Sequence, residues 1–256
     1  MKKINNLKDV KNLMKLSMYC GELLIKYGAE IYRAEDTVYR ICNSVENLKS
    51  IDAYVLPTGI FISCEYDSEV ITLFKKVYPS YTSLKKINLL NSFSRDFVRD
   101  KISIKEGFEI LSKIDETPKD HILKVSLFTG FAGAFFSVLY GGNINDFIAA
   151  YIITFLVVVF LEKISIFKLT FFINNFLGAF IISMLAIIFT RYGIGSNSDM
   201  IIIGSIMILV PGVAATNAIR DIMNGDILSG QMGLTKAIFI ALAIAIGVGV
   251  ALRIFM

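Results

Sequence analysis

The first part of the chain changes its hydrophobic period twice. Residues 7–27 fit an amphipathic helix, and residues 31–48 fit a second one whose apolar positions alternate steps of three and four. Between residues 51 and 77 the pattern shifts to short β-branched and aromatic runs, IDAYVL, GIFISCEY and EVITLFKKV, separated by turn residues. These runs predict three antiparallel strands.

Helical spacing returns after the predicted strands, at residues 82–100 and 103–115. In the second of these helices Ser103 and Glu106 form the pattern of a capping box. Residues 1–116 are therefore predicted to form an α+β domain with a small antiparallel sheet. Thr117 and Pro118 are expected to begin the next helix, as N-cap and first helical residue.

Five long apolar segments follow. They lie near 121–140, 147–161, 169–190, 199–218 and 234–255. A helix needs about 20 apolar residues to cross the hydrocarbon layer, and all but the second segment reach that length. We therefore predict a mainly α-helical membrane protein, with a five-helix transmembrane domain at residues 117–256.

Charge separates the two regions in the same way. Residues 1–120 contain 19 of the 26 Lys and Arg and 17 of the 22 Asp and Glu. Under the positive-inside rule, the short loops on the side of the first domain carry Lys163, Lys168, Arg220 and Lys236, against Arg191 and Arg253 on the other side. We expect the first domain and the N-terminus to be cytoplasmic, in a multi-pass protein of the membrane.

The segment LVPGVAATNAIRDIMNGDILSG at 209–230 is unusually polar for its position between two apolar runs. Pro211 and Gly212 predict a helix break. After the break, Asn217, Arg220, Asp221 and Asn224 recur on one face. A charged residue at the bilayer centre costs about 2.5–3.5 kcal/mol on insertion scales, so this face needs a polar cavity, an internal partner or the membrane interface.

We interpret this face as a substrate-binding element. Arg220 suits a carboxylate, and Asp221 or Asp226 suits an ammonium group or a proton. Asn174 and Asn175, inside the third apolar segment, are further candidates. The alternative is an interfacial amphipathic helix whose Arg220 contacts lipid phosphates.

Glu30, Arg33 and Glu35 form a charged group in the first domain. They are candidates for gating or regulation, although a solvated helix face with weak ion pairs would have the same pattern.

Other classes have no supporting motif. The chain lacks GxSxG, HExxH, Walker A and HRD strings, so an enzyme is not predicted. Cys20, Cys42, Cys64 and the single His121 do not form a zinc pattern, and no metal or cofactor is expected. No basic stripe with interleaved aromatics indicates nucleic-acid binding.

Four strings together resemble the threonine/serine exporter family of the ThrE type, and more closely the YjjP-type larger subunit of its two-subunit members. They are GAEIYRAEDTVYRI at 28–41, VLPTGIFIS at 55–63, GAFFSVLYGGNINDF at 133–147 and LVPGVAATNAIRDIMNGDILSG at 209–230.

The resemblance implies a secondary exporter of small hydrophilic metabolites in the bacterial cytoplasmic (inner) membrane. Its substrates would be threonine and serine or succinate-like dicarboxylates. A small membrane subunit of about five spans would be the partner, and we expect an oligomer. The alternatives are a membrane-anchored sensor or scaffold whose soluble domain binds a ligand, and a channel.

Overall fold

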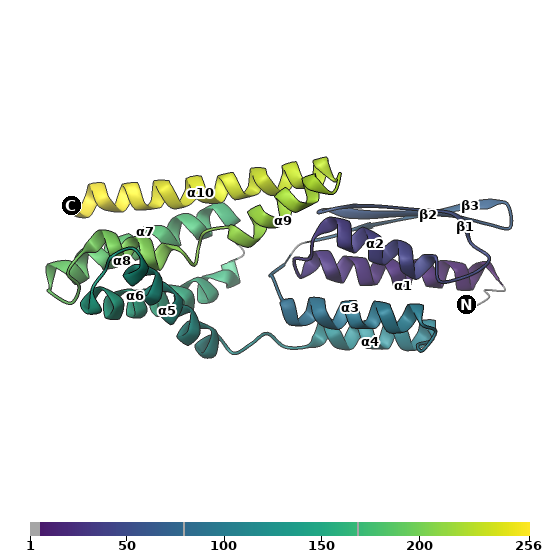
Figure 1. Cartoon of the computed structure of the whole chain (residues 1–256), viewed down its shortest axis with the longest axis horizontal. Helices are drawn as coiled ribbons and strands as arrows, with labels where there is room; N and C mark the ends of the chain where they lie inside the picture. The colour runs from purple at the N-terminus through teal and green to yellow at the C-terminus, as the bar shows by residue number, and fades with distance from the viewer. Residues whose placement is uncertain (1–5, 79, 168) are drawn as a thin grey trace. The chain divides into compact units, whose positions relative to one another are not determined.

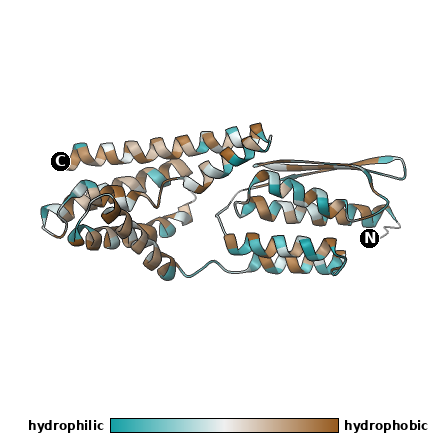
Figure 2. Cartoon of the chain, viewed as in Figure 1, coloured by the Kyte–Doolittle hydropathy of each residue, from teal (hydrophilic) through white to brown (hydrophobic). Residues whose placement is uncertain are grey.

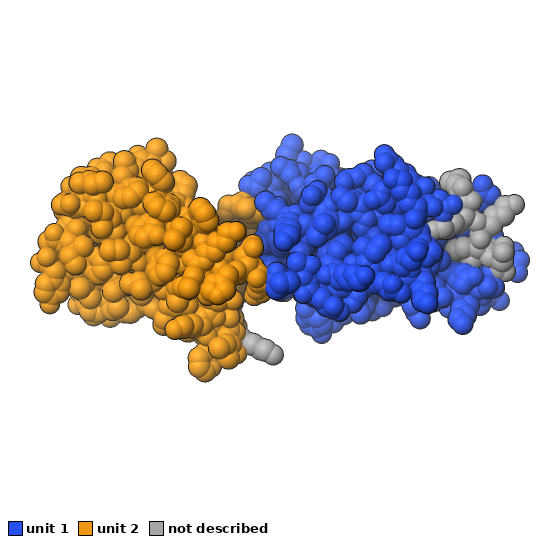
Figure 3. All heavy atoms as spheres, turned by 90° about the horizontal axis from the view of Figure 1, so that it is seen from below, with its two compact units in different colours: residues 1–118, 215–234 blue, residues 119–214, 235–256 orange. Residues whose placement is uncertain are grey.

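The computed structural model describes residues 6–78, 80–167 and 169–256, and Lys168, one of the basic residues behind the predicted orientation, lies outside them. The chain divides into two compact units (Figure 3). Unit 1 comprises residues 1–118 and 215–234, and unit 2 comprises residues 119–214 and 235–256. Unit 1 thus includes part of the polar segment that follows Pro211 and Gly212. The domain boundary at residue 116 stays a prediction.

Unit 1 is built in layers, with a three-stranded sheet over two pairs of helices (Figure 1). Its first elements are α1 (Leu7–Lys26), α2 (Ile31–Cys42), β1 (Lys49–Leu56), β2 (Gly59–Tyr66), β3 (Glu69–Lys76), α3 (Leu84–Val98) and α4 (Ile104–Glu116). The sheet is antiparallel in the order β1-β2-β3, as the change of period predicts. Helix α2 ends at Cys42. Val45 and Leu48, which were predicted to lie in this helix, belong to the segment that follows it and are buried there.

Helix α1 is the centre of the unit 1 core. Its residues Leu13, Leu16 and Leu23 are at most 1% exposed and pack among side chains of α2, the sheet, α3 and α4. The three cysteines are free and buried in the same core, and burial raises the pKa of the Cys20 thiol to about 12. The predicted capping box of Ser103 and Glu106 is present at the start of α4.

The prediction for Thr117 and Pro118 is wrong. Thr117 is the C-cap of α4, where its hydroxyl donates to the carbonyl of Lys113 at 3.0 Å, and the next helix begins only at Ile122. A Thr-Pro pair is compatible with either role, because proline also commonly follows a helix end.

Within the described residues, four helices are long and apolar enough to span a membrane. They are α5 (Ile122–Leu139), α6 with its short 3₁₀ extension (Ile144–Phe167), α7 (Phe171–Arg191) and α10 (Ile227–Phe255). Many of their large apolar side chains are exposed, including Phe128, Phe135 and Leu139, as a lipid-facing surface requires. Figure 2 shows the predominance of hydrophobic residues along these helices.

The prediction of five spans is therefore not confirmed. The segment at 199–218 is divided between α8 (Ser198–Ile206) and α9 (Gly212–Met223). Residues 207–211 separate them because Pro211 has no N–H to continue the helix. The second span is longer than predicted, since the capping box of Asn143 and Asp146 starts α6 at Ile144, three residues before the predicted start.

Candidate functional site

Helix α9 carries the polar face predicted from the sequence. A turn at Gly225, with φ +98°, joins it to α10, and Asp226 N donates to the carbonyl of Asp221 at 2.9 Å. Gly230, in the first turns of α10, faces α9, where a Cβ atom would lie 2.6 Å from the carbonyl oxygen of Ala218. The start of α10 therefore packs closely against α9.

Helix α2 begins in the string GAEIYRAED. Gly28 adopts φ +83°, which favours glycine, and ends α1. Glu30 is the N-cap residue of α2, but its side chain makes no capping hydrogen bond. The first N–H groups of a helix have no intrahelical acceptor, so those of α2 need one from elsewhere.

Asp221 supplies that acceptor from a position 190 residues later in the chain. Its Oδ1 accepts from the N–H of Ile31 at 3.1 Å, and the N–H of Tyr32 also faces the carboxylate. Asp221 is only 4% exposed. Burial raises its pKa, as do the charges of Asp226 and Glu30, while the two N–H groups act in the opposite direction.

Arg220 forms an ion pair with Glu30, the residue that precedes those N–H groups. The Glu30 side chain is 10% exposed and also accepts from Arg33 at 3.3 Å, whereas half of the Arg220 side chain is exposed. Asn217, one turn before Arg220, donates to the carbonyl of Gly28 at 3.3 Å. Three side chains of α9 thus contact the start of α2.

Glu35 and Asp226 complete the charged group. Glu35 accepts from the N–H of Val55 in β1 at 2.9 Å, and burial raises its pKa, as does the charge of Asp226. Burial also raises the pKa of Asp226. We call these seven residues the α2–α9 cluster: Glu30, Arg33, Glu35, Asn217, Arg220, Asp221 and Asp226.

The structure does not bring the remaining candidates into this cluster. Asn224 and Asn175 each donate to a carbonyl of their own helix, those of Arg220 and Phe171, both at 2.7 Å. Asn174 lies in unit 2, where its Oδ1 is buried without a hydrogen-bond partner among the described residues. Pro211 lies in the break before α9, and Gly212 is the first residue of α9.

A second polar network, which was not predicted from the sequence, immediately precedes Gly28. The carboxylate of Asp115 accepts from Lys26 at 2.6 Å and from the Tyr27 hydroxyl at 2.5 Å. Lys86, only 3% exposed, donates to that hydroxyl and to the Asp115 carbonyl. The network holds the end of α1 against α3 and α4, so the turn into α2 is fixed. The signal available in the sequence was Lys86, a lysine at a position of α3 where the helical period expects an apolar residue.

The family model ThrE, described as "Putative threonine/serine exporter", matches residues 15–255. The match includes all four strings that carry the resemblance and every residue of the α2–α9 cluster. The chain belongs to this family.

Among curated proteins, the chain of this ThrE family member is similar to an uncharacterized protein of Schizosaccharomyces pombe, with 22% identity over 245 residues. The similarity covers 91% of this chain but 29% of the yeast protein, so the chain spans less than a third of that relative's length. No solved structure matches the chain.

Proposed function

We propose that the chain is a subunit of a secondary exporter and that it selects threonine and serine at the α2–α9 cluster. Membership of a transporter family and four helices able to span a membrane support an export role. In this proposal the protein lies in the bacterial inner membrane with its N-terminus in the cytoplasm. It acts in an oligomer with a small membrane subunit of about five spans.

The ion pair between Glu30 and Arg220 carries this proposal. An α-amino acid bears a carboxylate and an ammonium group close together, which is the charge complement of a Glu–Arg pair. A guanidinium grips a carboxylate through two parallel hydrogen bonds, and a carboxylate accepts from an ammonium group. Arg220 is half-exposed, so an incoming carboxylate can reach it without unfolding the cluster.

The charge of the cluster favours an amino acid over a dicarboxylate. The cluster contains four carboxyl groups, on Glu30, Glu35, Asp221 and Asp226, and two guanidinium groups, on Arg33 and Arg220. A succinate-like dianion would add negative charge to this acidic surrounding. A zwitterion adds no net charge, and its ammonium group finds several acceptors.

Substrate binding at this pair would also provide gating. A zwitterion that enters between Glu30 and Arg220 replaces one of the contacts that hold α9 to α2. Helix α9 follows a break at Pro211 and Gly212, and discontinuous helices form substrate sites in many transporters. In this proposal Glu30, Arg33 and Glu35 hold α9 in one state, and substrate releases it for alternating access.

Counterflow in liposomes tests the function. The chain is reconstituted with and without its small partner, and exchange of labelled threonine, serine and succinate is measured. We expect saturable exchange of threonine and serine, and a loss of at least tenfold in Arg220→Ala. Arg40→Ala is the control, because Arg40 is an exposed arginine of α2 that pairs with Asp36, outside the α2–α9 cluster. Succinate exchange, or full activity in Arg220→Ala, would contradict the proposal.

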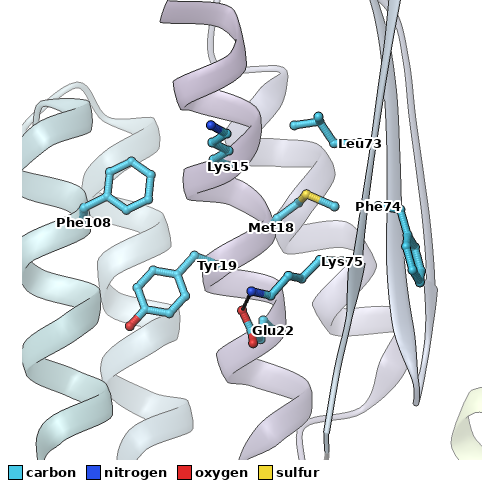
Figure 4. Close-up of a pocket in the computed structure, with 8 residues that line it drawn as sticks. All are labelled: Lys15, Met18, Tyr19, Glu22, Leu73, Phe74, Lys75 and Phe108. Carbon is cyan, nitrogen blue, oxygen red and sulfur yellow. Dashed lines mark ion pairs between the residues drawn. The ribbon is translucent and has the colours of Figure 1, made fainter.

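A pocket in unit 1 favours the sensor alternative. It has a volume of about 390 Å³ and opens between α1, β3 and α4 (Figure 4). Its lining comprises Lys15, Met18, Tyr19 and Glu22 of α1, Leu73, Phe74 and Lys75 of β3, and Phe108 of α4. A sensor would depend on this pocket and its 3.6 Å ion pair between Lys75 and Glu22. An exporter that uses the α2–α9 cluster retains exchange in Lys75→Ala.

A further inference from the structure

Strand β3 is an edge of the unit 1 sheet. Among the described residues it pairs with β2 alone, so one of its two sides carries no strand. The N–H of Val77 donates to the carbonyl of Thr58, on the β2 side, at 2.9 Å. Because the backbone groups alternate along an antiparallel strand, the N–H and C=O groups of Val70, Thr72 and Phe74 point to the unpaired side. This side can therefore pair with another strand.

The two edges of the sheet differ in how they are protected. Proteins usually disrupt an exposed edge with a bulge, a proline, a very short strand or a cover. Strand β1 has such a feature, since its register with β2 shifts between Lys49 and Asp52, where Ser50 adopts φ +47°. Strand β3 is eight residues long, contains no proline and pairs with β2 without a shift over its whole length. It is thus the edge that is ready for pairing.

The outer face of the sheet exposes apolar side chains next to this edge. Val70 is 72% exposed and Phe74 is 57% exposed, and both belong to β3. Tyr54 of β1 pairs with Phe61 of β2, and Phe61 pairs with Phe74, whose ring centroid lies 4.5 Å from that of Phe61. This row of rings ends at the unpaired side of β3. Contiguous exposed apolar residues often mark an interaction surface.

The charges of β3 lie near its two ends and are complementary. Glu69 and Lys75 are both exposed. When two copies of a strand meet antiparallel about a two-fold axis, each side chain stays on its own face of the joined sheet. A register centred on Thr72 meets this requirement and places Glu69 opposite Lys75 twice and Val70 opposite Phe74 twice. A register centred one residue to either side loses the charge pairing.

We propose that β3 pairs with β3 of a second copy of this chain, in the register centred on Thr72. The two three-stranded sheets then form one continuous antiparallel sheet. Val70 and Phe74 cover each other across the interface, and Glu69 forms an ion pair with Lys75 of the second copy. Glu22 of α1 lies 3.6 Å from Lys75 in its own copy, and an ammonium group has donors left for a second carboxylate.

This interface is small, because it consists of a single pair of strands. We therefore expect a reversible dimer, which the confinement of both copies to one membrane favours. The dimer does not depend on transport and does not rest on the proposed function.

Cross-linking of introduced cysteines in liposomes tests the register. The three native cysteines of the full chain are free and buried, so an introduced exposed thiol reacts first. The two copies of residue 72 would have Cα atoms about 5.5 Å apart, whereas the two copies of residue 70 would lie about 14 Å apart. A bis-maleimide whose reach falls between these distances should join Thr72→Cys at least tenfold more efficiently than Val70→Cys.

Tyr54→Cys is the control for chance collisions. Tyr54 lies on the same face and is 50% exposed, but it belongs to β1 at the other edge of the sheet. It should cross-link as weakly as Val70→Cys. No cross-linking of Thr72→Cys, or cross-linking of either other variant to the same extent, would overturn the proposal.

Charge reversal provides a second measurement without introduced cysteines. Sedimentation of the purified full chain in detergent gives the dissociation constant of the dimer. Glu69→Lys places like charges opposite each other and should raise this constant at least threefold, and adding Lys75→Glu should restore it. Asp52→Lys, at an exposed acidic residue of β1, is the matched control and should leave it unchanged. A monomeric unmodified chain, an unchanged constant in Glu69→Lys, or no recovery in the double variant would overturn the proposal.

These outcomes are independent of counterflow. A dimer without amino-acid exchange would contradict the proposed function alone. Exchange by a chain whose Thr72→Cys variant does not cross-link would contradict the β3 interface alone.

Discussion

Asp146 in unit 2 and Asp221 in unit 1 are both buried carboxylates that accept N–H groups from a distant part of the chain. Asp146 is 1% exposed and accepts from Asn143, Ser196 and Asn197 at 2.7–3.0 Å. Asp221 is 4% exposed and accepts from Ile31 at 3.1 Å. The same chemistry therefore joins remote segments in both units.

The surroundings of the two carboxylates differ. Three backbone N–H groups converge on the side chain of Asp146, so its oxygens have the hydrogen-bond partners that a buried polar group needs. Asp221 has Asp226 and Glu30 nearby, and its pKa is raised by burial and by these two charges. We infer that Asp146 acts as a permanent link between loops, whereas the contact of Asp221 with α2 can be released.

The largest predicted effect is that of Asp146→Ala. It leaves three backbone N–H groups without their acceptor, so the free energy of unfolding should fall by about 3 kcal/mol or more. Thermal denaturation of the purified chain measures this loss. Asp199→Ala, at an exposed site in the first turn of α8, should change stability far less. Similar midpoints for the two variants would contradict the proposed link.

Gly230→Ala should disturb the surroundings of Asp221 and leave those of Asp146 unchanged. The added Cβ would lie 2.6 Å from the Ala218 carbonyl, which must shift, at a cost of about 1–3 kcal/mol. Because α9 carries Arg220 and Asp221, threonine exchange should fall together with stability. Gly249→Ala in the same helix has no heavy atom within 4 Å of the new Cβ and serves as the control. An equal loss of exchange and stability in Gly249→Ala would show that α10 is sensitive to any added side chain and that the contact with α9 is not the cause.

Asp221→Asn should cost about 1 kcal/mol, because an amide oxygen can still accept from Ile31 but the charge is lost at the start of α2. Chemical denaturation of the full chain gives the free energy. A loss as large as that of Asp146→Ala would mean that the contact of Asp221 with α2 is as rigid as the link made by Asp146.

The smallest effect concerns pH. Burial raises the pKa values of Asp221, Asp226 and Glu35 in the folded chain, so the fold takes up protons at a higher pH than the unfolded chain. Their contribution to stability is complete below the ordinary values of 3.8 and 4.5 and is lost as pH rises through the raised values. The unfolding midpoint should therefore rise slightly from pH 7 to pH 5, and less in Asp226→Asn.

Asp115 acts in the opposite direction but in a different pH window. Burial raises its pKa, but the bonds from Lys26 and Tyr27 outweigh this effect and hold it below its ordinary value of 3.8. Its stabilising contribution is present above that value and is lost only in stronger acid. An unfolding midpoint that decreases as the pH is lowered from 7 to 5 would contradict the assignment of raised pKa values to Asp221, Asp226 and Glu35.

The fold was predictable where a local pattern determines structure. The change from helical period to β-branched runs located the sheet, and Ser103 with Glu106 located the start of α4. Pro211 indicated a break, but the length of the apolar run at 199–218 predicted one span. The predicted span at 199–218 is not formed because the α-helical hydrogen-bonding pattern of α8 ends at Ile206.

The candidate site was predictable in composition but not in its pairing. The spacing identified Arg220 and Asp221 on α9, and Glu30 was a separate candidate for gating. Their contact joins positions 190 residues apart, which no local period encodes.

Competition for threonine counterflow by two analogues tests the central claim most directly. One analogue is the carboxamide of threonine, which lacks the carboxylate for Arg220, and the other is the α-hydroxy acid, which lacks the ammonium group for Glu30. If the Glu30–Arg220 pair binds both charged groups of the substrate, unlabelled threonine competes and both analogues compete at least tenfold more weakly. If either analogue competes as well as threonine, one half of the pair has no role in binding and the account is wrong.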